Sequence, residues 1–192
     1  YITTKSTKVN LQMDMDSNLD NKNDRYLNSE FSSSSVTLMP GKTISGSGAL
    51  TTADTSAEKV EKTKVAIAQS NVGNSRSAVK LTNKGRINFT GTGMAGIVGE
   101  YSEINNESVI NVTGTDSTGI ISANGSLAIN NGTINIGNGG TGLAGINYLG
   151  VTDTLASSIP TYGNQSIDLV HNGSIVSTGN SAAIGVLASD LK

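Results

Sequence analysis

Four acidic residues form the densest group of potential catalytic side chains in this sequence: Glu100, Glu103, Glu107 and Asp116. Polysaccharide hydrolases and lyases use clustered carboxylates, often with a Lys or Arg, to carry out proton transfer at a glycosidic bond. Glu107 and Asp116, however, occupy turn positions where similar segments of the chain carry Lys, Asn or Gly. We therefore interpret the four as a solvated face and keep a carbohydrate-active enzyme, a lyase or hydrolase, as the alternative.

Other candidate chemistry is sparse. The chain has no Cys and one His, His171, which excludes thiolate metal sites and most zinc and His-dependent catalytic schemes. His171 stands where similar segments have Asn, so we interpret it as a surface turn residue. Asn138–Gly142 resembles a calcium-binding nonapeptide but lacks the Asp that such a loop needs. We expect no catalytic residue, no metal site and no cofactor.

The composition of the chain limits the classes of partner and the type of core that we expect. The formal charge is −2, and no basic patch is interleaved with aromatic residues, so nucleic acid is not an expected partner. No apolar run approaches the ~18 residues that span a bilayer, so we expect no membrane insertion by this segment. Aromatic residues make up only 4% of the chain, too few for a typical globular core but enough for a solenoid whose turns share their burial. We expect a monomer, and a trimeric adhesin head is disfavoured because such heads repeat at shorter intervals.

The secondary structure that would position any functional site is predicted by a repeated sequence pattern. Asn83–Ile97 reads NKGRINFTGTGMAGI, and similar copies follow at Asn106–Ile120, Asn130–Ile146 and, more distantly, His171–Val186. The central isoleucines, Ile87, Ile110 and Ile134, are 23 and 24 residues apart. A fixed period of 20–50 residues is the signature of a stacked-repeat architecture.

Within each copy apolar and polar residues alternate, as in Ile87-Asn88-Phe89-Thr90, which predicts a strand with one buried face. The pattern predicts an all-β chain folded as a right-handed parallel β-helix of about 23 residues per turn. By length alone the chain would hold seven or eight turns, a rod on the order of 35–40 Å long. Asn83, Asn106 and Asn130 lie at equivalent positions and are the best candidates for a hydrogen-bonded side-chain ladder.

Two regions depart from the repeat. Residues 1–64 read as an irregular N-terminal cap with short strands, among them the alternating segment Val9–Met15, and residues 65–192 as the β-helix. Between Ile146 and His171 the chain is about 15 residues longer than the equivalent connections, which predicts an excursion at 147–166. Insertions in repeat arrays map to one face and often to the binding face, so Tyr148, Leu149 and Tyr162 are candidate partner contacts. A loop that folds back over the core is the alternative.

The repeat in its fullest form, NNGTINIGNGGTGLAGI at 130–146, resembles the passenger regions of type V autotransporters, most of all the large outer-membrane adhesins of fusobacteria. The resemblance covers about residues 79–190. It implies export to the bacterial cell surface, presentation as a stalk or head, and attachment to host-cell receptors, glycans or other bacteria. No signal peptide begins at Tyr1 and no β-barrel signature precedes Lys192, so we read the chain as a fragment of a passenger, exposed on the outer membrane or secreted.

Overall fold

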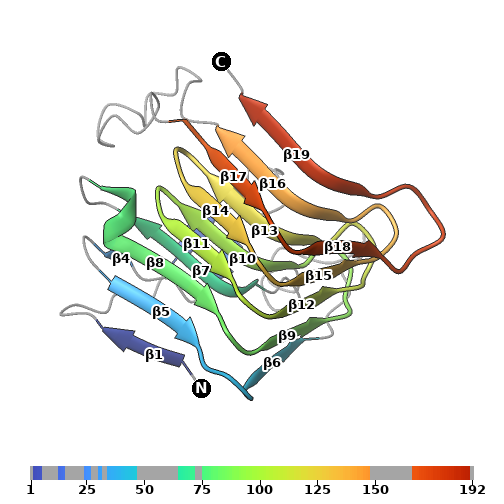
Figure 1. The fold of residues 1–192 in the computed structure, drawn as a ribbon, viewed down its shortest axis with the longest axis horizontal. Helices are drawn as coiled ribbons and strands as arrows, with labels where there is room; N and C mark the ends of the chain where they lie inside the picture. Colours follow the sequence, from blue (N-terminus) through green and yellow to red (C-terminus); the bar gives the residue numbers. More distant parts are fainter. Residues whose placement is uncertain are drawn as a thin grey trace.

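The computed structural model describes residues 2–5, 13–15, 24–26, 30–31, 34–46, 65–71, 75–147 and 166–190. Strands are nearly the only regular secondary structure in the described residues, and most of them stack into three sheets (Figure 1). One short 3₁₀ helix, η1 (Arg76–Ala78), interrupts them. The strands β2 (Met13–Met15) and β3 (Asp24–Tyr26) form a separate two-stranded sheet.

Each turn of the chain contributes one strand to each sheet. Sheet 1 contains β1 (Ile2–Lys5), β5 (Ser34–Leu38), β8 (Val79–Asn83), β11 (Glu103–Asn106), β14 (Leu127–Asn130) and β17 (Asp168–His171). Sheet 2 contains β6 (Thr43–Gly46), β9 (Arg86–Phe89), β12 (Val109–Val112), β15 (Thr133–Ile136) and β18 (Ser174–Ser177). Sheet 3 contains β4 (Glu30–Phe31), β7 (Val65–Asn71), β10 (Ala95–Glu100), β13 (Thr118–Ala123), β16 (Thr141–Asn147) and β19 (Ile184–Asp190).

The pairing confirms a parallel β-helix. Ile87 aligns with Ile110, and Ile110 aligns with Ile134, in parallel register along sheet 2. The described strands make five turns rather than the seven or eight estimated from length. The estimate was wrong because it assumed one spacing throughout. Ile44 and Ile87 are neighbours in the stack although 43 residues separate them, and so are Ile134 and Ile175, 41 residues apart.

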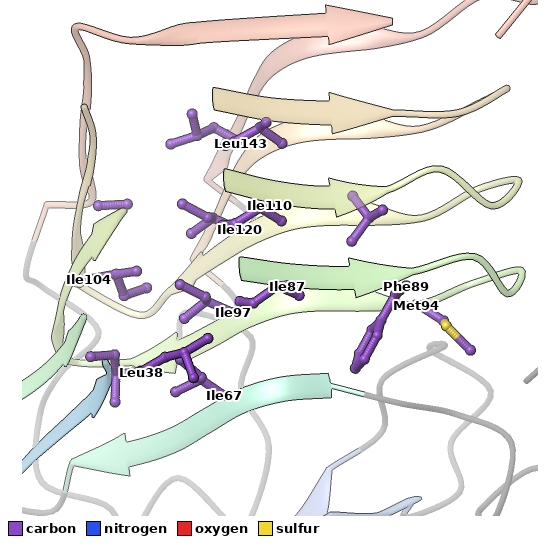
Figure 2. Close-up of a cluster of buried hydrophobic side chains, with 14 of the residues drawn as sticks. Leu38, Ile67, Ile87, Phe89, Met94, Ile97, Ile104, Ile110, Ile120 and Leu143 are labelled. Atoms are coloured by element: carbon purple, nitrogen blue, oxygen red, sulfur yellow. The ribbon is translucent and has the colours of Figure 1, made fainter. Parts of the chain in front are cut away.

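The core is a set of vertical columns of aliphatic side chains inside the coil. Ile87, Ile110 and Ile134 are each 0% exposed, as are Ile97 and Ile120 in the adjoining column of sheet 3. Figure 2 shows Ile87 and Ile110 beside Ile97 and Ile120 inside the coil. Each turn supplies only a few apolar residues, and the turns above and below complete their burial. This arrangement explains how a chain so poor in aromatic residues forms a dry interior.

The β-helix starts earlier than the predicted boundary at residue 65. β5 pairs in parallel with β8, and β6 pairs in parallel with β9, so 34–46 belongs to the first turn. The reason is that Val36 and Leu38 alternate with polar residues and fill the same inward positions as later strands, with exposed fractions of 8% and 0%.

Before this turn the chain is less regular. β1 runs antiparallel to β5 and so covers the outer edge of sheet 1. Of the predicted strand Val9–Met15, only β2 (Met13–Met15) is described, and it pairs antiparallel with β3 (Asp24–Tyr26). Residues 9–12 lie outside the described residues. The role of the N-terminal region as a cap stays a prediction.

Candidate contact surface

The corner that joins sheet 3 to sheet 1 carries the predicted excursion. In two inner turns this corner is short, 101–102 and 124–126, but between β16 and β17 it extends from 148 to 167. Tyr148, Leu149 and Tyr162, the candidate partner contacts, lie outside the described residues. The structure does describe the point at which the chain returns to the stack, at Ser166.

A single arginine holds this return point. The Arg76 guanidinium, on η1, forms an ion pair with the Asp168 carboxylate at 2.5 Å and donates to the Ser166 carbonyl oxygen at 3.2 Å. It also donates to the carbonyl oxygen of Gly125, on the corner one turn below, at 3.3 Å. Arg76 therefore ties the end of the excursion to two other connections of the same corner. The sequence gives no sign of this contact, because 92 residues separate Arg76 from Asp168.

Sheet 2 presents a ladder of asparagines on its outer face. Asn111 donates from Nδ2 to the Oδ1 of Asn88, and Asn135 donates to the Oδ1 of Asn111 at 2.6 Å. All three side chains are half-buried. The outer column beside them also carries hydroxyl groups, with Ser174 Oγ donating to Thr133 Oγ1 at 3.1 Å. Over β9, β12 and β15 the side chains of this face are therefore polar and spaced by the strand separation. Above Asn135 the column continues with Val176, which is 45% exposed.

The neighbouring corner, between sheets 1 and 2, continues the polar surface. Lys84 forms an ion pair with Glu107 at 3.4 Å, and Glu107 accepts a hydrogen bond from Asn105 at 3.1 Å. Higher up the corner, Asn172 donates to the Oδ1 of Asn131 at 3.0 Å. The surface groups of successive turns are thus linked to one another, which restricts their orientation.

A second asparagine ladder lies inside the coil and matches the prediction. Asn83 donates to Asn106 at 2.8 Å, and Asn106 donates to Asn130 at 2.7 Å, with all three side chains 0% exposed. His171 completes this column, with its Nδ1 3.1 Å from the Nδ2 of Asn130. His171 is exposed, as predicted, but it ends a strand and a ladder rather than forming part of a turn.

The four candidate carboxylates lie around the coil instead of converging. Glu100 ends β10 in sheet 3, Glu103 begins β11 in sheet 1, Glu107 follows at the next corner, and Asp116 lies at the corner between sheets 2 and 3. Glu103 pairs with Lys80 at 3.6 Å and Glu107 with Lys84, in each case one turn below. Glu100 accepts a hydrogen bond from Asn124 at 2.7 Å. Glu100, Glu103 and Glu107 therefore link adjacent turns of the coil.

In the segment that resembles a calcium-binding loop, the Asn138 side chain binds the backbone of the turn above. Asn138 Oδ1 accepts hydrogen bonds from the backbone N–H groups of Asn180 and Ser181, at 2.7 and 3.1 Å. Within the described ranges no group of three or more His, Cys, Asp or Glu side chains is placed to hold a metal ion. The same part of the chain contains no helix long and apolar enough to cross a membrane.

The fold and its polar outer faces define the chain as a parallel β-helix of stacked repeats. Comparison with known proteins adds no relative: the sequence matches no protein-family model and no curated protein, and the structure matches no solved structure.

Proposed function

We propose that this chain is an adhesive surface module, a β-helical passenger segment of a bacterial autotransporter. It holds contact surfaces away from the outer membrane, where they meet host-cell receptors, glycans or the surfaces of other bacteria. The proposal places the protein on the bacterial cell surface, or in a secreted form of the passenger.

One observation carries the proposal: the outer face of sheet 2 and the corner between sheets 1 and 2 carry polar side chains linked from turn to turn. The corner between sheets 3 and 1 carries the return point of the excursion, which Arg76 holds in place. A rigid coil keeps such a surface in one orientation over several turns, so weak contacts along it act together. The excursion itself supplies Tyr148 and Tyr162, and tyrosine is a residue type enriched among the anchors of protein interfaces.

The test compares the 192-residue chain with a variant in which 148–165 is replaced by Asn-Gly-Ser, the short connection found at 124–126. Both proteins are measured for binding to glycan arrays, epithelial cells and whole bacteria. Loss of binding in the variant, with the thermal stability retained, supports the excursion as the contact site. Binding that persists in the variant and falls when Asn88, Asn111 and Asn135 are changed to Ala would assign contact to sheet 2. No binding by the intact chain in any of the three assays would contradict an adhesive role.

A β-helical carbohydrate-active enzyme is the alternative, and the carboxylates argue against it. Glycosidases hold two carboxyl groups roughly 5–10 Å apart across one bond, free to exchange protons. Here Glu103 and Glu107 are each engaged by a lysine. Release of reducing or unsaturated ends from a panel of polysaccharides, abolished by Glu103→Gln or Glu107→Gln, would restore the enzymatic reading.

A further inference from the structure

At the end of the stack formed by β17, β18 and β19, an apolar side chain at a core position, that of Val186, is exposed. Val186 aligns with Leu143 of the turn below, yet Val186 is 49% exposed whereas Leu143 is 0% exposed. Among the described residues six large hydrophobic side chains are exposed, and five of them belong to these three strands. The five are Val170, Val176, Ile184, Val186 and Leu187.

A column of glycines in sheet 3 shows how closely each turn packs against the turn above it. At Gly96, Gly119 and Gly142 a Cβ would lie 2.5–2.6 Å from the carbonyl oxygen of the next glycine up the column. The same Cβ would lie 2.5–2.8 Å from the Cγ2 of an isoleucine in the turn above: Ile110, Ile134 or Ile175. Glycine is needed at each position because the turn above approaches so closely.

Gly185 is the fourth glycine of this column, but no atom of the described residues lies within 4 Å of the place its Cβ would take. Its backbone is also outside the left-handed region that favours glycine. Nothing in the described structure therefore requires glycine at 185. Each of the three lower glycines lies beneath a further turn, whereas Gly185 has no turn above it among the described residues.

We propose that the end formed by β17, β18 and β19 is the docking surface for one further β-helical turn of the same polypeptide. That turn would pair in parallel with the three strands and place a carbonyl oxygen and a branched aliphatic side chain over Gly185. It would also cover Ile175 and Val186, and an asparagine in it would continue the inner ladder above His171. The inference rests on packing and is independent of the adhesive role.

A second copy of the chain fits this surface less well. To continue the stack head to tail, the copy would offer the free edges of its first turn, β5, β6 and β7. The edge of β5 is already occupied by the antiparallel strand β1, and that of β7 by β4. A further turn with the repeat pattern would extend all three sheets in parallel register.

The experiment adds such a turn. A copy of residues 124–147 is joined after Ser189 in place of 190–192, since Ser189 aligns with Ile146, which aligns with Ala123 before the corner at Asn124. Gly185→Val is then made in the 192-residue chain and in the extended chain, and thermal unfolding is followed by circular dichroism. Gly142→Val is the matched control, because its Cβ would meet Gly185 O at 2.6 Å in both proteins.

We expect Gly185→Val to change the Tm of the 192-residue chain by less than about 2 °C and to lower that of the extended chain by roughly 5 °C or more. Gly142→Val should lower both. Equal effects of Gly185→Val in the two proteins would overturn the proposal. The proposal would also be overturned if the added turn raised the Tm equally with and without Ser at the positions copied from Ile134, Ile136 and Leu143. Sedimentation that shows a dimer of the 192-residue chain, dissociated by Gly185→Val, would assign the surface to a second copy and overturn it as well.

Discussion

The side chain of Asn83 donates a hydrogen bond from Nδ2 to the Oδ1 of Asn106 at 2.8 Å, although 23 residues separate the two asparagines. Both are fully buried. Asn106 donates onward in the same sense to Asn130, so the amides of three turns form one directed chain. A buried amide is stable only when its polar atoms are paired, and stacking in register pairs them.

Replacement of the middle asparagine should be costly. Asn106→Ala removes the acceptor of Asn83 and the donor of Asn130, so we expect a loss of about 2–4 kcal/mol in the free energy of unfolding, measured by urea denaturation. Asn111→Ala is the matched control, since Asn111 holds the middle of the half-buried outer ladder and should cost about 1 kcal/mol. Equal losses in the two variants would show that burial does not strengthen the inner ladder.

His171 ends this ladder and can be replaced by the residue that the other turns use. The direction of the ladder makes Asn130 Nδ2 the donor and His171 Nδ1 the acceptor. We expect His171→Asn to preserve or raise stability by up to about 1 kcal/mol, and His171→Leu to lower it by about 1–2 kcal/mol because the amide of Asn130 loses its acceptor. Thermal unfolding of both variants checks this; similar stabilities would contradict the role of His171 as an acceptor.

Asp116 occupies a backbone position that suits glycine. Its φ is 55°, and Gly93 and Gly139, at the same corner of the adjacent turns, have φ of 67° and 65°. A left-handed backbone costs a residue with a Cβ roughly 1 kcal/mol, so we expect Asp116→Gly to stabilise the protein by about 0.5–1 kcal/mol. Asp116→Ala removes the carboxylate but keeps the Cβ and should not stabilise. If both variants gain equally, the charge rather than the backbone is responsible.

Arg76 should act locally. The Arg76 and Asp168 side chains are 29% and 44% exposed, so the ion pair contributes little to global stability. We expect Arg76→Ala to leave the Tm within about 3 °C and to raise hydrogen exchange at residues 166–169 several-fold, because the return point of the excursion loses its ties. Lys80→Ala, which breaks an outer ion pair elsewhere on the stack, serves as the control and should not change exchange there. Unchanged exchange in Arg76→Ala would rule out the anchoring role.

Much of this architecture could be predicted from the repeats. Period-two alternation around Ile87, Ile110 and Ile134, set in a period of 23–24 residues, allows burial only when successive copies stack in register. The same register places Asn83, Asn106 and Asn130 above one another, which is why the inner ladder was predictable. The poor alignment of Glu107 and Asp116 with neighbouring copies likewise indicated a solvated face, and both residues are exposed in the structure.

Other features depend on contacts that no local pattern records. The first turn begins at β5, since Val36 and Leu38 find their burial only against β8 of the next turn. Arg76 meets Asp168 because η1 projects along a corner shared by distant parts of the chain. The uncovered position of Gly185 is recognised only by comparison with the lower glycines of its column, each of which is in close contact with the turn above. Periodicity thus determined which residues repeat, whereas the tertiary structure decided which turns meet and where the stack remains uncovered, because those outcomes depend on packing between segments far apart in sequence.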